Sequence, residues 1–227
     1  MNLKQILSAL KKEELITIIL DLAEEYEEIE KGLLFNYSSN EDIITSSKKL
    51  MKESIKQSKY REFISWNKLD DALQGVYMTL NKARQMLLEE EPDVAISLCL
   101  IILPEVLDML NYSDDSGGYI SPVVSNSLEI INDAVYFVSY LDEKQQESFF
   151  TKILIEAEHS RYDDWNEWRF NLLESCIHFC SIEKLRNKLE NLLEKLLSEI
   201  KGNSWSEDYN KENIKLLQYQ ILNNLME

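Results

Sequence analysis

Apolar side chains recur every three or four positions along almost the whole chain, which is the spacing of one face of an α-helix. The pattern is clear where Leu15, Ile18, Leu22, Ile29 and Leu33 form one stripe, along a single helix or a closely spaced pair. Polar clusters separate this stripe from the next ones. The pattern predicts helices over residues 3–10, 15–33, 42–59, 66–90, 94–110, 121–138, 143–159, 165–180, 183–201 and 207–225.

The scarcity of turn residues points to the same fold class. Five glycines and three prolines leave little room for the tight reversals of a β-sandwich or barrel. We predict an all-α fold of antiparallel helical hairpins, in an irregular array or an α-solenoid-like arrangement of the TPR or HEAT kind. No period near 34 residues repeats. We expect an N-terminal helical segment, 1–60, and a main helical-repeat region, 61–227, which should be one continuous domain.

Several local features refine this prediction. The connection over 89–93 is so short that the helices on either side must be antiparallel, and Gly75 would allow a neighbouring helix to approach closely. Pro104 should kink the helix that contains it, because proline removes a backbone hydrogen bond. The helix over 42–59 is rich in lysine and weakly apolar, which predicts a peripheral position. Gly202 and the following asparagine are expected to cap the helix before them.

Composition narrows the class of partner. Apolar residues make up 44% of the chain and charged residues 29%, which is typical of a soluble globular protein. The net charge of −17 would repel phosphate backbones and anionic lipids, so we expect no direct nucleic-acid or membrane partner. The acidity serves either solubility or a basic partner.

The cellular compartment follows from the cysteines and from the apolar runs. The three cysteines, Cys99, Cys176 and Cys180, do not form a secreted disulfide framework, and the first residues lack an apolar signal core. The longest apolar run, 94–110, is interrupted by polar and charged residues. We therefore expect a cytoplasmic protein.

Two segments are candidates for a binding surface. The stretch from Arg161 to Arg169 is the densest cluster of aromatic, acidic and arginine residues, a composition enriched at recognition sites. Its structural alternative is that Trp165 and Trp168 pack inside, Asp164 caps the helix that follows, and Arg161 or Arg169 pairs with a nearby carboxylate. The loop around Asp114 serves either binding or turn and capping chemistry. The candidate residues are Asp114, Asp115, Ser116, Arg161, Asp164, Trp165, Trp168 and Arg169.

No complete catalytic or metal motif accompanies these segments, and we predict no cofactor and no metal. Glu156-x-x-His159 has the spacing of one half of a di-iron site, but the second half is missing. Cys176 and Cys180 share a helix face without further zinc ligands and are expected to be buried thiols. The first hypothesis is therefore a non-enzymatic helical protein–protein interaction module. The alternative is a metal-dependent or other enzyme that uses His159 with the carboxylates of Glu156, Asp114, Asp115, Asp163 and Asp164.

Parts of the sequence resemble a known family. Residues 8–25, Asp71-Ala72-Leu73-Gln74-Gly75, the loop 112–117, and Arg161-Tyr162-Asp163-Asp164-Trp165-x-x-Trp168-Arg169 are similar to the helical region of bacterial SWIM-type zinc-finger-associated proteins. The Cys-x-Cys and Cys-x-His pairs that hold zinc in that family do not occur in this sequence. The resemblance implies a bacterial cytosolic helical module and carries over no catalytic residue.

Self-association is a third hypothesis. Leucines recur at heptad-like spacing from Leu185 to Leu196, followed by Ile200. Either this row or the last predicted helix could form the contact of a homodimer.

Overall fold

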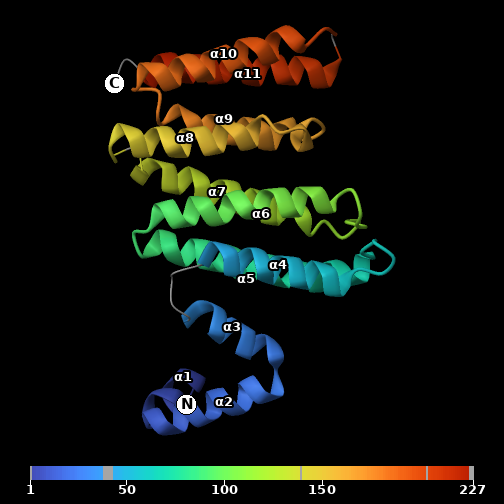
Figure 1. Cartoon of the computed structure of the whole chain (residues 1–227), viewed down its shortest axis with the longest axis vertical. Helices are drawn as coiled ribbons and strands as arrows, with labels where there is room; N and C mark the ends of the chain where they lie inside the picture. The colour runs from blue at the N-terminus through green and yellow to red at the C-terminus, as the bar shows by residue number, and fades with distance from the viewer. Residues whose placement is uncertain (1, 38–42, 139, 203, 225–227) are drawn as a thin grey trace. The chain divides into compact units, whose positions relative to one another are not determined.

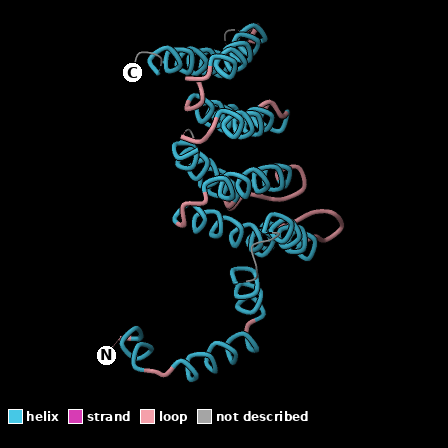
Figure 2. Tube along the Cα trace, turned by 60° about the vertical axis from the view of Figure 1, so that its left-hand side comes forward, coloured by secondary structure: helices cyan, strands magenta, loops and turns pink. Residues whose placement is uncertain are grey.

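The structure is a computed structural model of the chain that describes residues 2–37, 43–138, 140–202 and 204–224. Within these residues all regular secondary structure is helical, and β-type pairing is limited to two isolated bridges, Tyr60 with Phe63 and Ile64 with Ser113. Figure 2 shows the helices joined by loops, without a sheet. The all-α fold class predicted from the sequence is confirmed.

Contacts along the chain divide it into two compact units, Met1–Ser46 and Ser47–Glu227. The boundary falls inside α4 (Ile43–Ser58), the helix that the sequence predicts over 42–59. The sequence-based division at residue 60 lies just after α4, in the second unit.

The first unit contains α1 (Leu3–Ala9), α2 (Lys12–Glu25) and α3 (Glu27–Tyr37) (Figure 1). The side chain of Asn2 accepts a hydrogen bond from the backbone N–H of Gln5, whose side chain accepts one in return, so α1 begins with a capping box. Tyr26 adopts an extended conformation and separates α2 from α3. The stripe predicted over 15–33 therefore belongs to a closely spaced pair of helices.

The second unit contains the larger part of α4 and seven further α-helices in its described residues. Their bounds are α5 (Trp66–Leu88), α6 (Pro92–Met109), α7 (Ile120–Val138), α8 (Glu143–Ala157), α9 (Asn166–Ile177), α10 (Glu183–Glu199) and α11 (Trp205–Asn224). A short 3-10 turn, η2 (Ser160–Tyr162), joins α8 to α9. The sequence predicts each α-helix with its ends displaced by a few residues.

Helices of the second unit pack against neighbours that are close in the sequence. Contacts join α5 to α6, α6 to α7, α8 to α9, α9 to α10 and α10 to α11. Further contacts join helices two apart: α5 to α7, α7 to α9, α9 to α11, α6 to α8 and α8 to α10. Figure 1 shows the connections from α5 onward at alternate ends of the helices.

The contact between α4 and α5 depends on Gly75. A Cβ atom at this position would lie 2.7 Å from the carbonyl oxygen of Leu50 and 2.9 Å from Cα of Met51. The close approach of a neighbouring helix to Gly75 is thus confirmed, and that neighbour is α4. Met51 and Ile55 of α4 are buried, while Lys48, Lys49, Lys52 and Lys56 on the same helix are exposed.

Some details at helix ends differ from the sequence-based prediction. α6 continues through Pro104 as one helix, and the kink expected there stays a prediction. The N-cap of α9 is Trp165, whose side chain makes no capping hydrogen bond, so the expected aspartate cap is wrong. α10 ends at Glu199 with the extended Ile200 as its C-cap, before Gly202, and residue 203 lies outside the described part of the chain.

The leucine row of α10 is part of the core. Leu185, Leu189 and Leu193 are fully buried, and α10 packs against α8, α9 and α11. Leu196 and Ile200 at the end of the row are half-buried, and the homodimer hypothesis stays a prediction. Among the described helices, none combines the length and the apolar character needed to cross a bilayer.

Candidate functional site

The segment from Arg161 to Arg169 joins α8 to α9, and its two arginines bind nearby carboxylates and backbone carbonyls. Nη1 of Arg161 lies 2.9 Å from Oε1 of Glu156, and its Nε lies 3.2 Å from Oδ1 of Asp108 near the end of α6. Tyr162, fully buried, donates its phenol hydrogen to Glu156 over 2.9 Å. Burial and the adjacent Glu156 carboxylate raise the pKa of Tyr162, so the phenol stays protonated and remains a donor. Arg161 thus links α8 to the end of α6 by binding a carboxylate on each helix.

Arg169 has a similar role on the other side of the connection. Its Nε donates to the carbonyl of Ala157 over 3.0 Å, and its Nη2 donates to the carbonyl of His159 over 3.2 Å and to Asp163 over 2.6 Å. Asn166 accepts from Nη1 over 2.9 Å. The guanidinium therefore binds carbonyls at the last residue of α8 and just beyond it, where a helix leaves carbonyls without a partner of its own. The structural alternative for the two arginines fits this geometry.

The two tryptophans of the segment differ in exposure. Trp165 and Trp168 stack with centroids 4.7 Å apart, and Trp165 exposes 43% of its surface whereas Trp168 exposes 8%. Trp168 also lines a polar cavity of about 320 Å³ with Glu129 and Asp133 of α7. Asp164 is exposed. Of the candidate residues in this segment, Asp164 and Trp165 are therefore the ones that a partner could reach most easily.

The Asp114 loop follows α6 and is held by its own side chains. Oδ1 of Asp114 accepts from the backbone of Ser116 over 3.0 Å, and Oδ1 of Asp115 accepts from the backbone of Tyr119 over 2.6 Å, at the start of α7. The backbone N–H of Asp114 donates to the carbonyl of Ile64 over 2.9 Å. Among the described hydrogen bonds and ion pairs, none joins this loop to the segment from Arg161 to Arg169.

The residues named for a metal-dependent activity are engaged elsewhere. Nδ1 of His159 accepts from the backbone N–H of Arg161 over 3.2 Å and caps η2. Glu156 and Asp163 bind the two arginines. In the described ranges, the structure contains no group of three or more His, Cys, Asp or Glu side chains placed to hold a metal ion. Cys99, Cys176 and Cys180 are buried free thiols, as the sequence predicts for Cys176 and Cys180.

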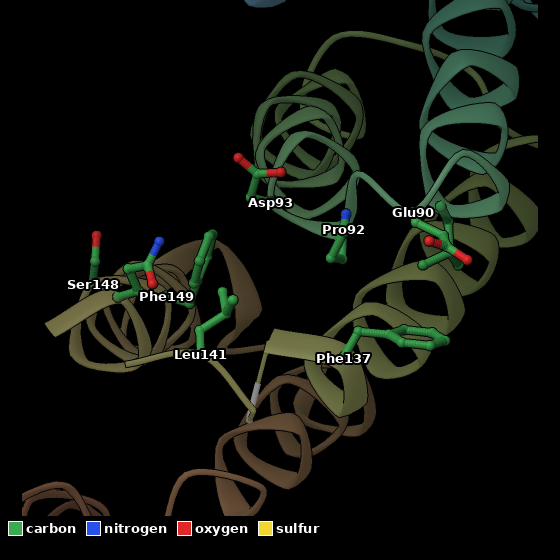
Figure 3. Close-up of a pocket in the computed structure, with 9 residues that line it drawn as sticks. Glu90, Pro92, Asp93, Phe137, Leu141, Ser148 and Phe149 are labelled. Carbon is green, nitrogen blue, oxygen red and sulfur yellow. The ribbon is translucent and has the colours of Figure 1, made fainter. Parts of the chain in front are cut away.

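A larger pocket lies at the opposite ends of the helices, where sequence reasoning placed no site. It has a volume of about 690 Å³ and is formed by the ends of α5 and α7 and the beginnings of α6 and α8. Pro92 points toward Leu141 and Phe149 across the pocket (Figure 3). The lining residues are Leu87, Glu90, Pro92, Asp93, Phe137, Leu141, Gln145, Ser148 and Phe149. We call this the α5–α8 pocket.

Exposed aromatic side chains extend the apolar surface beyond the pocket. Phe137 is 53% exposed, and its ring lies 5.7 Å from that of Tyr136, which in turn lies 5.5 Å from Tyr140. Both contacts are edge-to-face. The apolar stripe that predicts α7 consists of Val124, Leu128, Ile131, Val135 and Val138 and does not include these three residues. The signal in the sequence was therefore the aromatic side chains outside this stripe.

Carboxylates border the same pocket on the α5–α6 side. Glu90 and Asp93 line it, and Glu89 and Glu91 are exposed beside them. Glu90 has φ +62°, a left-handed conformation that glycine adopts more readily. Glu90 lies where the chain turns from α5 into α6. The acidic side chain of Glu90 therefore occurs at a position whose backbone conformation favours glycine.

Family models, curated proteins and solved structures give no match to this chain. The resemblance to the SWIM-associated helical region therefore stays a prediction.

Proposed function

We propose that this protein is a non-enzymatic helical interaction module, and that its α5–α8 pocket binds a basic amphipathic helix of a partner protein. The observation that carries the proposal is an apolar pocket with carboxylates along one side. A helix with an apolar face and lysine or arginine beside it would match both features.

The packing of the second unit supports an interaction module. We interpret α4 to α11 as antiparallel hairpins stacked in an α-solenoid-like arrangement, because helices contact both the next helix and the next but one. In such stacks each repeat contacts mainly its neighbours, and the extended surface is used to bind other proteins. The three buried free cysteines suit a reducing compartment such as the cytoplasm.

The shape of the apolar surface favours a helix over a small molecule. The pocket alone has the volume of a typical ligand site. However, Tyr136 and Tyr140 continue the apolar surface from Phe137 to the outside of the pocket, as the anchors of a several-turn helix would require. The net charge of −17 and the acidic α5–α6 turn add attraction for a basic partner.

The proposal can be tested with a defined probe. A fluorescein-labelled peptide of leucine and lysine that forms an amphipathic helix would be titrated with the full chain, and anisotropy would give the Kd. A peptide of the same composition in permuted order, without an apolar face, controls for attraction between opposite net charges. We expect the amphipathic peptide to bind at least about tenfold more tightly than the permuted one.

Matched variants locate the binding site. Glu90→Gly removes a pocket carboxylate at a positive φ, and Glu62→Gly makes the same change at φ +63° in the α4–α5 connection. Likewise Phe137→Ser removes an exposed pocket side chain, and Leu216→Ser removes a similarly exposed one on α11. We expect Glu90→Gly and Phe137→Ser to raise the Kd several-fold and the two controls to leave it unchanged. Failure of the amphipathic peptide to bind, equal binding of both peptides, or a Kd insensitive to the pocket variants would overturn the proposal.

A further inference from the structure

The cavity that Trp168 lines between α7 and α9 is bordered by three carboxylates. It has a volume of about 320 Å³, and Glu129 and Asp133 of α7 and Glu167 of α9 lie around it, whereas its lining contains no lysine or arginine. Residues four apart share one side of a helix, so Glu129 and Asp133 form one row on α7. Glu167 and Asn171 form a second row on α9, which packs against α7. We call this the α7–α9 cavity.

The three carboxylates have no partner in the part of the chain that the structure describes. The side chains of Glu129, Asp133 and Glu167 form no hydrogen bond and no ion pair there. Arg169 of α9 does not neutralise them, because its guanidinium binds Asp163 and carbonyls at the end of α8. Two like charges four apart destabilise a helix, so the stability of α7 does not account for Glu129 together with Asp133.

Trp168 supplies a hydrogen-bond donor to the same cavity. Its side chain stacks on Trp165, and only 8% of its surface is exposed. A tryptophan covered to this extent normally has an acceptor for its indole N–H. Among the described residues the N–H of Trp168 has none, although the nitrogen is not sealed inside the protein. Because Trp168 lines the cavity, an acceptor on a molecule bound there would complete this hydrogen bond.

These groups define the chemistry of the ligand. Carboxylates only accept hydrogen bonds, and a guanidinium group offers five N–H donors in one plane with a positive charge. A metal ion is a poorer match, since no group of three or more His, Cys, Asp or Glu side chains in the described ranges is placed to hold one. The indole N–H of Trp168 needs an acceptor on the same ligand. A peptide carbonyl is neutral, whereas the carboxylate of a free amino acid would be repelled by the three acidic side chains.

We propose that the α7–α9 cavity binds an arginine side chain of a partner polypeptide. The guanidinium lies between Glu129, Asp133 and Glu167, and a backbone carbonyl next to the arginine accepts from the indole N–H of Trp168. Asn171 donates to the carbonyl of Glu167 over 2.8 Å, which leaves its amide oxygen as a further acceptor. Ligand sites start at about 300 Å³, so a cavity of this size holds one long side chain with its peptide group.

The surface beside the cavity also favours a polypeptide over a small molecule. Tyr136 follows Asp133 by three residues and Glu129 by seven, so it lies on the same side of α7. Its ring contacts that of Phe137, which lines the α5–α8 pocket. A chain that leaves the cavity along α7 therefore reaches this pocket within about two helical turns. The inference does not depend on what the α5–α8 pocket binds.

NMR of the tryptophan side chains tests the proposal on the full chain. The probe is the peptide acetyl-Gly-Arg-Gly-amide, titrated into ¹⁵N-labelled protein. The chain has four tryptophans and therefore four indole N–H signals, and the variant Trp168→Phe assigns the one that belongs to Trp168. We expect this signal to shift in a saturable way, because the N–H gains an acceptor. The same peptide with citrulline, whose neutral urea replaces the guanidinium, should not shift it.

Matched variants locate the peptide. Glu129→Gln with Asp133→Asn keeps the size of both side chains and should raise the Kd of the arginine peptide at least about tenfold. Asp21→Asn with Glu25→Gln neutralises the same two residue types at the same spacing on α2, where both are exposed, and should leave the Kd unchanged. Phe137→Ser should leave it unchanged as well, which separates this site from the α5–α8 pocket. Far-UV circular dichroism should show that each variant keeps its helices.

Each of the following results would overturn the inference. Absence of binding, or equal binding of the citrulline peptide, would show that the carboxylates do not select a guanidinium. A Trp168 signal that stays in place at saturation would put the peptide elsewhere, and a Kd raised by Phe137→Ser would put it in the α5–α8 pocket. Equal weakening by the α2 control would reduce the effect to attraction by the net charge. Agmatine, which carries a guanidinium but no carbonyl, would identify a small-molecule site if it bound as tightly and shifted the signal equally.

Discussion

Arg161 and Glu156 form an ion pair in which one guanidinium nitrogen lies 2.9 and 3.2 Å from the two carboxylate oxygens. Both side chains are largely covered, with 13% and 12% of their surface exposed. Removing one partner of a covered pair leaves the other without compensation for its lost hydration. We expect Glu156→Ala to lower the free energy of unfolding by about 2 to 3 kcal/mol, because it removes the acceptor of both Arg161 and Tyr162.

Urea unfolding checks this value, and an exposed pair supplies the control. Lys184 lies 2.6 Å from Glu147, but the two side chains are 65% and 40% exposed. Lys184→Ala should therefore change stability by less than about 0.5 kcal/mol. Equal effects of the two substitutions would mean that the Arg161–Glu156 pair does not join α8 to the rest of the unit as described.

The helices could be predicted from the sequence because each apolar stripe reports a local periodicity. Leu69, Leu73, Val76 and Leu80 illustrate this, since they recur every three or four residues in the sequence and all four are buried on α5. Helix ends were less predictable, because contacts distant in the sequence help to set them. Arg169, for example, binds the carbonyls of Ala157 and His159 and so stabilises the end of α8 from a position in α9.

The candidate site was beyond what the sequence could predict. The α5–α8 pocket combines the ends of four helices, and its residues have no common spacing along the chain. Conversely, Arg161 and Trp168 have the composition of a recognition surface, yet they are largely covered. Composition identifies residues that form strong contacts, but only packing decides whether those contacts lie within the chain or with a partner.

The α4–α5 connection contains a turn with unfavourable residues. Arg61 and Glu62 have φ values of +49° and +63°, and Tyr60 and Phe63 exchange backbone hydrogen bonds of 2.8 and 3.1 Å around them. Positive φ at both central positions is typical of a type I′ turn, which favours Asn-Gly. Arg61→Asn with Glu62→Gly should raise the free energy of unfolding by about 1 kcal/mol, after allowance for the exposed Lys59–Glu62 pair.

Thermal unfolding followed by circular dichroism would measure the change. A comparison with Glu62→Gln, which removes the charge and retains a side chain at the positive φ, separates the backbone effect from the ion pair. If the Gln variant gained as much stability as the Asn-Gly variant, the backbone explanation would be wrong.

The buried thiols should make stability depend on alkaline pH. Burial raises the pKa of Cys180 from 9.0 to about 12 and also raises the pKa of Cys176. The folded chain therefore retains thiol protons that the unfolded chain releases above about pH 9, so this stability is complete below pH 9 and is lost as pH rises toward 12. For Cys180 alone the loss should approach about 1.4 kcal/mol by pH 10.

Comparing variants isolates the contribution of Cys180 from that of the tyrosines, which titrate in a similar range. Urea unfolding at about pH 8 and about pH 10 should show a smaller loss for Cys180→Ala than for the wild type, even though the variant is less stable at both values. Identical losses in the two proteins would show that Cys180 is accessible to solvent.

For Gly75→Ala we predict a change in stability of the opposite sign to the one that helix propensity alone predicts. In an exposed helix interior, replacing glycine by alanine stabilises by about 1 kcal/mol. At Gly75, however, the added Cβ would meet the backbone of Leu50 and Met51 at 2.7 to 2.9 Å, and backbone atoms cannot rotate away. Gly75→Ala should therefore force α4 and α5 apart and destabilise by about 2 kcal/mol in urea unfolding. Asn81→Ala, on the exposed side of α5, should be neutral or slightly stabilising. A stabilised Gly75→Ala variant would mean that α4 does not pack against α5 at this distance.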